Sequence, residues 1–396
     1  MLHNIKKLPG DNRMEKTLSR RNWFKSSFAL GTGLAFTPAL LDSLMAAPVS
    51  EAERLHNLSS FKPDTLIRLG SNENPYGPSA KAREAVKNIL SEGNRYTHTS
   101  AAQFKEILAK KEGVSPDYIL MGAGSSELLC LAGMSVGLEG GAVLSAFPVF
   151  RLLMDYAAKF NARWDTVNLD EYLVHDLEGL ASAVKPDTKI MFLVNPNNPT
   201  GTVVEKAKYK AFCEEMSKKT VVYSDEAYLE FLDPSEQQSM SELVKQGNKN
   251  VIVSRTFSKV YGLAGLRVGY VVAHPDLIKK MSAKQIWGSY NQAGIAAAQA
   301  SLGDEEFMAY TRKKNAEARE HLFKYLDSKK WQYGKSQANV VFFPAPKDGK
   351  TILDETKAKG FEIRVWDYLG KEWCRVSIGT LDEMKAFTKM FDTVVS

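Results

Sequence analysis

The sequence predicts an α/β protein, with a large domain built on a mainly parallel sheet that helices flank on both faces and a smaller α+β domain after it. Short, continuously apolar and often β-branched runs recur along the chain, and helix-length segments separate them. The last third has the pattern of a long helix followed by more strands. The expected strands of the large sheet are 142–144, 190–194, 220–223, 251–253 and 268–272.

The remaining elements follow from local patterns. Asn, Pro and Gly mark loops, and apolar residues at helical spacing mark helices. Before the first of these strands we expect a loop over 70–78, helices over 79–90 and 101–111, a strand near 120–122 and a helix over 128–136. After the last one we expect a long helix from about residue 285 and strands near 339–343 and 374–378.

Composition excludes several classes of protein. The net charge is +6, but residues 1–48 hold seven basic and three acidic side chains, so the rest of the chain carries only +2. No basic stripe with interleaved aromatic residues appears, so nucleic acid is not an expected partner. The sequence contains no uninterrupted run of about 18 apolar residues, so we expect no stable membrane association. The three cysteines are scattered, with no metal-binding spacing, so we predict no metal site.

The N-terminus has the pattern of an export signal. Residues 19–25 read Ser-Arg-Arg-Asn-Trp-Phe-Lys, and the uncharged stretch 26–41 follows. The paired arginines resemble a twin-arginine signal, which predicts a periplasmic protein exported in folded form. The alternative is a disordered basic tail beside a short amphipathic helix, and the protein would then be cytoplasmic. The cleavage point stays open, because Pro48 directly follows Ala47.

These patterns divide the chain into four parts. The predicted division is a signal peptide over 1–47, an N-terminal arm over 48–75, a large domain over 76–285 and a small C-terminal domain over 286–396.

Unusual polar residues follow four of the expected strands. Parallel sheets place ligands at the carboxyl ends of their strands, so these side chains would meet. Each segment alone has a simpler explanation as a turn, a helix cap or a surface charge. Together they suggest one site. The segments are 122–127, 195–201, 224–228 and 254–259, with Arg267 eight residues further on.

At this point the chain resembles a known family. From about residue 68 to 389 it is similar to the fold-type-I aminotransferases, nearest the histidinol-phosphate aminotransferase group. That resemblance implies a large domain with a seven-stranded sheet and a pyridoxal 5'-phosphate cofactor. The matching segments are 71–78, 195–201, 225–228, 255–259, 263–270 and 374–380.

The resemblance implies roles for the residues near the cofactor ring. Lys259 would form the Schiff base with pyridoxal phosphate and then move a proton for the reaction. Asp225 would pair with the ring nitrogen and keep it protonated. Tyr228 and Asn195 would both contact the phenolate oxygen of the ring. Phe150 matches the position of an aromatic ring that stacks on the cofactor, although packing in the core explains it equally well.

The cofactor phosphate needs amides, hydroxyls and a cation. A helix N-terminus supplies backbone N–H groups and a favourable dipole, and an arginine supplies forked hydrogen bonds. The expected phosphate-binding residues are Gly124, Ser125, Ser126, Thr256, Ser258 and Arg267.

Substrate recognition is implied in the same way. Arg375 would bind the α-carboxylate, with Asn195 beside it, and Arg364 would contact a distal phosphate. Tyr96 matches a tyrosine that reaches the phosphate of the partner subunit, which implies a homodimer with shared active sites. The chain departs from the family at 97–99, where a proline usually follows that tyrosine, and in the short aromatic segment 365–373.

The leading interpretation is an aminotransferase that acts between an amino acid, or a histidinol-phosphate-like amine, and a 2-oxo acid. One alternative is a pyridoxal-phosphate-dependent amino-acid decarboxylase of the same fold, because the cofactor motifs do not decide which bond at Cα breaks. A second is a non-catalytic protein that binds cofactor or amine. The complete set of expected roles favours an enzyme.

Overall fold

The computed structural model describes residues 66–396. The predicted signal peptide over 1–47, and the part of the predicted arm that ends at residue 65, lie outside the described residues. The described chain belongs to one compact unit. The boundary at 285/286 therefore stays a prediction. Within 66–396, no helix has both the length and the apolar character needed to cross a bilayer.

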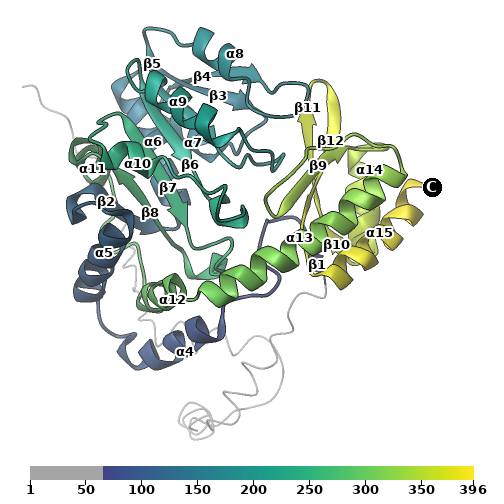
Figure 1. The fold of residues 1–396 in the computed structure, drawn as a ribbon, viewed down its shortest axis with the longest axis horizontal. Coiled ribbons are helices and arrows are strands. Elements are labelled where there is room, and N and C mark those ends of the chain that lie inside the picture. Colours follow the sequence, from purple (N-terminus) through teal and green to yellow (C-terminus); the bar gives the residue numbers. More distant parts are fainter. Residues whose placement is uncertain (1–65) are drawn as a thin grey trace, which may run out of the picture. The chain divides into compact units, whose positions relative to one another are not determined.

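A seven-stranded sheet carries the larger part of the fold (Figure 1). Its strands lie in the order β2-β8-β7-β6-β5-β3-β4, and only β8 runs against the others. The predicted α/β fold class is confirmed. The strands are β2 (Ile119–Ala123), β3 (Ala142–Phe147), β4 (Arg163–Asn168), β5 (Thr188–Val194), β6 (Val221–Asp225), β7 (Val251–Thr256) and β8 (Val268–Ala273).

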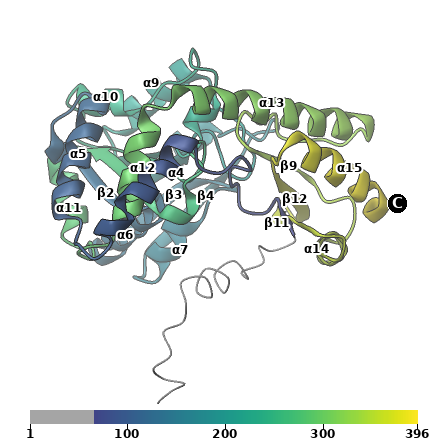
Figure 2. The same ribbon diagram turned by 90° about the horizontal axis from the view of Figure 1, so that it is seen from below.

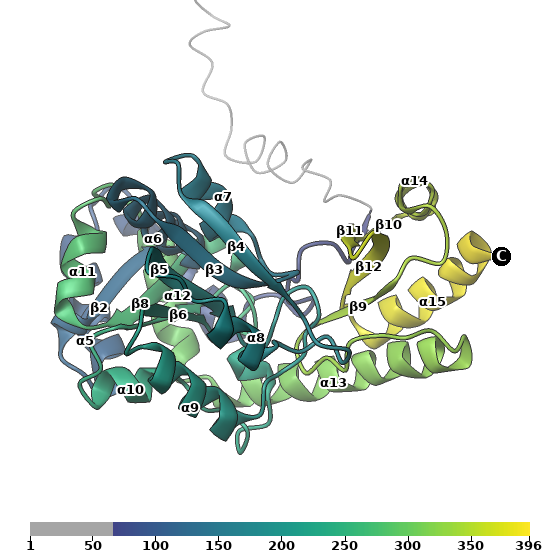
Figure 3. The same ribbon diagram turned by 90° about the horizontal axis from the view of Figure 1, so that it is seen from above.

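The strands are apolar throughout because both faces of the sheet are covered. Successive side chains of a strand point to opposite faces. In β5, Ile190 and Phe192 belong to one core cluster, and Met191 and Leu193 belong to another. Figure 3 shows helices on the two sides of the sheet, with α6, α7 and α11 on one and α9, α10 and α12 on the other.

The helices of the described chain pack on the seven-stranded sheet and on a smaller antiparallel sheet in the C-terminal part. Figure 2 shows the longest of them, α13, running from the region of α12 to the C-terminal sheet. The helices are α4 (Ala80–Ile89), α5 (His98–Glu112), α6 (Ser125–Glu139), α7 (Leu152–Ala158), α8 (Leu177–Ser182), α9 (Lys206–Met216), α10 (Ser241–Lys245), α11 (Pro275–Ser282), α12 (Gln292–Leu302), α13 (Glu305–Ser328), α14 (Gly349–Ala358) and α15 (Leu381–Val395).

A second, antiparallel sheet lies in the C-terminal part. It has the order β11-β12-β9 and packs on α13 and α15 through a separate core that includes Leu322 and Phe387. A short parallel pair, β1 with β10, ties residues 67–68 to this part of the chain. The strands are β1 (Ile67–Arg68), β9 (Val340–Pro344), β10 (Phe361–Glu362), β11 (Arg364–Tyr368) and β12 (Lys371–Ser377).

Candidate active site

Most of the residues predicted for the site line one cavity of about 770 Å³. It lies where β6 and β7 end, and residues of β11 and β12 line it as well. The carboxyl ends of parallel strands meet at one edge of a sheet, which explains why distant segments converge here. The predicted residues that line it are Ser125, Ser126, Phe150, Asp225, Tyr228, Thr256, Ser258, Lys259, Arg267, Arg364 and Arg375.

Lys259 follows the end of β7 and is half-buried. Its Nζ lies 3.3 Å from the carbonyl oxygen of Ser71 and 3.2 Å from that of Asn72. It also lies 5.5 Å from the ring centroid of Tyr228. Burial, together with the positive charge of Arg375, lowers the pKa of the Lys259 amine to about 8. A substantial fraction of this amine is therefore neutral, and so nucleophilic, near pH 8.

Asp225 is the last residue of β6, and its side chain is buried. Its Oδ1 accepts hydrogen bonds from Ser254 Oγ at 2.9 Å and from the backbone N–H of Ala227 at 3.2 Å. Burial raises the pKa of the Asp225 carboxyl to about 6, while the Ser254 hydroxyl acts in the opposite direction. Asp225 is therefore mostly ionised at neutral pH and would pair with a protonated ring nitrogen.

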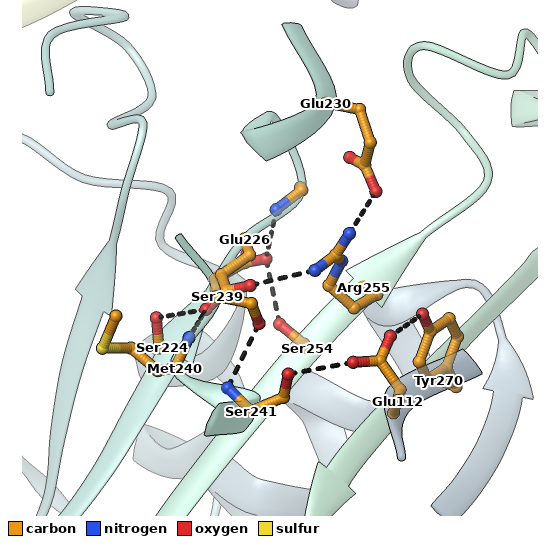
Figure 4. A network of polar contacts seen from close by, with 12 residues as sticks. Glu112, Ser224, Glu226, Glu230, Ser239, Met240, Ser241, Ser254, Arg255 and Tyr270 are labelled. Carbon is orange, nitrogen blue, oxygen red and sulfur yellow. Dashed lines mark hydrogen bonds and ion pairs between the residues drawn. The ribbon is translucent and has the colours of Figure 1, made fainter. Parts of the chain in front are cut away.

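A buried ion cluster ties the strand of Asp225 to the strand that leads to Lys259 (Figure 4). Arg255 of β7 donates from Nη1 to Glu226 Oε2 at 3.2 Å and from Nη2 to Glu230 Oε1 at 2.5 Å. Glu226 directly follows Asp225, and its backbone N–H donates to the Ser254 carbonyl. The cluster thus joins the ends of β6 and β7 through residues that do not line the cavity.

The N-terminus of α6 forms the anion-binding end of the cavity. Gly124 is its N-cap, with φ +75° and no side-chain cap, so the first N–H groups of the helix are open to a ligand. A Cβ at Gly124 would overlap the Arg267 guanidinium. Arg267 Nη1 lies 3.3 Å from Ser258 Oγ, and Nη2 lies 3.4 Å from Ser126 Oγ. These groups suit a phosphate dianion.

Tyr228 connects to the substrate end through two asparagines that the sequence analysis did not assign. Asn72 Nδ2 donates to the Tyr228 hydroxyl oxygen at 2.9 Å, and Asn198 Nδ2 donates to it at 3.2 Å. Both amides donate, so the Tyr228 O–H proton is free for a ligand. Arg375 Nη1 donates to Asn198 Oδ1 at 3.3 Å, and its Nη2 contacts the Gly70 carbonyl.

Asn195 lies elsewhere than the sequence led us to expect. Its Oδ1 accepts from the backbone N–H of Val204 at 3.0 Å, so the side chain holds the loop together rather than lining the cavity. Asn198, three residues later in the same 195–201 segment, takes the position beside Tyr228 and Arg375. The segment was the right signal, but the sequence alone did not tell which asparagine points inward.

Two further predicted residues lie outside the cavity lining. Gly124 contributes its backbone at the α6 N-terminus, as described above. Tyr96 is exposed and lines a different cavity of about 590 Å³. Its ring centroid lies 5.4 Å from that of Trp287 and 5.9 Å from that of His98. Within its own subunit, Tyr96 is therefore not part of the site around Lys259.

Fold and site define a class of protein: an α/β enzyme in which a lysine, a buried carboxylate and an anion-binding helix end surround one cavity. The pattern of the class I and II aminotransferases matches residues 64–391. The chain belongs to this family.

Individual relatives agree with that assignment. The chain is 34% identical over 362 residues to histidinol-phosphate aminotransferase 2 of Ralstonia nicotianae, covering 90% of this chain and 96% of that one. It is 31% identical over 350 residues to the histidinol-phosphate aminotransferase of Moorella thermoacetica, covering 88% and 89%. The crystal structure of the Sinorhizobium meliloti histidinol-phosphate aminotransferase in complex with pyridoxal-5'-phosphate matches with a TM-score of 0.75 and 26% identity, covering 92% and 98%.

Proposed function

We propose that this protein is a pyridoxal-phosphate-dependent aminotransferase that moves an amino group between an amino acid, or a histidinol-phosphate-like amine, and a 2-oxo acid. One observation carries the proposal. The amine of Lys259, whose pKa burial lowers to about 8, and the buried Asp225 carboxylate face the same cavity as an open helix N-terminus.

The residues present fit pyridoxal phosphate. The α6 N-terminus, with Ser126, Ser258 and Arg267, would bind the phosphate. Asp225 would hold a proton on the ring nitrogen, and Tyr228, with its free O–H, would donate to the ring oxygen. When bound, the cofactor supplies an electron sink for the bond broken at Cα. Lys259 would attach the cofactor and then move the proton at Cα, as a partly neutral amine can at neutral pH.

The substrate end supports an amino acid as donor. Arg375 is buried and donates a hydrogen bond to Asn198. Burial is the main cause that lowers the pKa of its guanidinium to about 10. A substrate carboxylate would compensate that buried charge through forked hydrogen bonds. Arg364 lies opposite Arg375 across the β11–β12 ladder and would contact an anionic group further along the substrate. The histidinol-phosphate aminotransferases named above motivate testing that amine directly.

The test is a half-reaction without a 2-oxo acid. The purified protein, loaded with pyridoxal phosphate, is mixed with amino donors, including histidinol phosphate and aromatic and acidic amino acids. We expect the cofactor absorbance to convert to that of pyridoxamine phosphate, because the amino group moves to the cofactor. Release of carbon dioxide without this conversion would support the decarboxylase instead. A protein that never takes up cofactor colour would overturn the enzyme assignment.

Lys259→Ala is the decisive variant. It should lose the conversion by several orders of magnitude, because no other amine described in the cavity lining can replace Lys259. Lys249→Ala, which removes an exposed lysine from outside the cavity, is the matched control and should behave as the unaltered protein.

We further propose a homodimer with shared active sites. Tyr96, Ile286 and Trp287 are large side chains left exposed, and all three line the second cavity. Exposed apolar patches of this kind are typical of protein interfaces. In a symmetric dimer the patch would meet its own copy, and Tyr96 would reach the phosphate-binding end of the partner's cavity.

We also propose that residues 1–47 direct export to the periplasm by the twin-arginine route, on the strength of the paired arginines at 20–21 and the uncharged stretch after them. Periplasmic and cytoplasmic fractions are separated, and the N-terminus of the protein is sequenced in each. The proposal requires a shortened, periplasmic form. A chain that begins at Met1 and stays in the cytoplasm would refute it.

A further inference from the structure

The cavity around Lys259 has an aromatic wall that the roles above leave unused. Trp366, in the middle of β11, and Phe147, the last residue of β3, both line the cavity, and both are half-buried. They come from the two different sheets. We propose that Trp366 is a specificity-determining residue that selects substrates with a flat aromatic side chain. The inference rests on the proposed function, because it concerns the substrate of the same site.

The position of Trp366 follows from the register of the small sheet. Side chains of alternate residues share a face of a strand, so Trp366 lies on the same face as Arg364. Arg364 pairs with Arg375 across the ladder, which places all three side chains on one face. The guanidinium carbon of Arg375 lies 5.8 Å from the ring centroid of Trp366. A carboxylate bound at Arg375 would therefore place the next carbons of the substrate beside this ring.

The wall is held in place by further rings. The ring centroid of Tyr368 lies 6.0 Å from that of Phe147 and 5.9 Å from that of Trp373. Trp373, the cross-strand neighbour of Trp366, stacks on Phe342 at 4.9 Å. Among the described residues, Trp366 itself forms no ring–ring pair. A ligand ring would supply the missing partner without reordering the wall, because the neighbouring rings are already packed.

Arg364 would contact a distal anionic group, but the other charges of the cavity lining reduce what that contact contributes to binding. Arg364 is exposed, and its Nε donates to the Gly70 carbonyl at 3.1 Å. The cavity lining also includes the carboxylates of Glu73 and Asp367. A second anionic group on the substrate would therefore meet repulsion from these carboxylates as well as attraction to Arg364, and the two would partly cancel. An aromatic ring carries no such charge and gains the contact with Trp366 in full.

Carboxylates that lack an amino group cannot react, so their binding tests the proposed selectivity of Trp366 without turnover. Isothermal titration calorimetry is performed on the protein with bound pyridoxal phosphate, with 3-phenylpropanoate, 4-methylpentanoate and glutarate as ligands. We expect 3-phenylpropanoate to bind about tenfold more tightly than the other two, as an aromatic contact beyond simple area burial implies. In Trp366→Leu, which keeps an apolar side chain but removes the ring, this preference should fall to about twofold. Trp366→Phe should retain most of it.

Tyr172→Ala is the matched control, because it removes an exposed ring that does not line the cavity. Its ligand preference should not change. An unchanged preference in Trp366→Leu, or tightest binding of glutarate by the unaltered protein, would overturn the proposal. Failure of the proposed function gives a different result, because it appears as absent amino-group transfer while the ratio of the dissociation constants is still measured.

Discussion

At the scale of single residues, the environment of Lys259 decides the chemistry of the site. Its amine is half-buried and close to Arg375, and both effects disfavour the ammonium form. Asp225 and Glu73 act in the opposite direction, but more weakly than burial does. A lysine at the surface would be almost fully protonated at pH 8. Lys259 is about half neutral there, and the neutral form is the one that attacks a carbonyl carbon.

This predicts a pH profile for cofactor attachment. Below the pKa of about 8, the neutral fraction of Lys259 rises tenfold with each pH unit, and above it the fraction levels off. The rate of attachment of pyridoxal phosphate to cofactor-free protein, followed by stopped-flow absorbance between pH 6 and 10, should show that bend. Arg375→Gln should move the bend to higher pH, because it removes a neighbouring positive charge. A rate that keeps rising to pH 10 would contradict a lowered pKa.

Single residues also differ in how well the sequence predicts their positions in the site. Residues at the end of a strand, such as Asp225, or at the start of the helix that follows a strand, such as Ser125, line the cavity because the strand end fixes their location. Asn195 and Asn198 share one loop, and which amide points inward depends on the path of the backbone between them. Asn72 was missed because its contact with Tyr228 joins positions 156 residues apart.

At the scale of elements, hydrophobic runs identified the buried strands but not the exposed ones. β5 and β8 were predicted because both of their faces are buried. β4 was not predicted, since it lies at the edge of the sheet and none of its residues is fully buried. β11 was missed for the same reason: it is the edge of the small sheet, and polar residues interrupt its aromatic ones. Edge strands do not need a continuous apolar run.

We expect a large loss of stability when the buried ion cluster between β6 and β7 is broken by mutation. Arg255 is buried between Glu226 and Glu230, so Arg255→Leu would leave two buried carboxylates without their cation. Breaking a buried pair in this way costs about 3–5 kcal/mol of the free energy of unfolding. Urea denaturation of the cofactor-free protein measures that loss directly.

Arg163→Leu is the matched control, because Arg163 also contacts two carboxylates, those of Asp165 and Asp187, but at the exposed surface. Its urea midpoint should change little, since water and salt screen exposed ion pairs. Equal losses in the two variants would mean that the Arg255 cluster does not join the strands as described.

At the scale of the whole molecule, the position of Tyr96 bears on the proposed dimer, because Tyr96 does not line the Lys259 cavity of its own subunit. The tyrosine is exposed, lies in a separate cavity and packs beside Trp287. An aromatic cluster at the surface is costly to leave in water and typical of an interface. If the proposed dimer forms, each Tyr96 serves the cavity of the other subunit. The two residues Lys259 and Tyr96 then act in the same site while belonging to different chains.

Mixing two variants, each of which lacks one of these side chains, tests that arrangement. Lys259→Ala lacks the attachment amine, and Tyr96→Ala lacks the side chain proposed to cross the interface. A mixed dimer holds one site that lacks both groups and one that has both. After unfolding and joint refolding in equal amounts, random pairing should restore about a quarter of the normal activity. Size-exclusion chromatography with light scattering confirms that dimers form. If Tyr96 acts within its own subunit, or not at all across the interface, the mixture will be no more active than the average of the two variants measured separately.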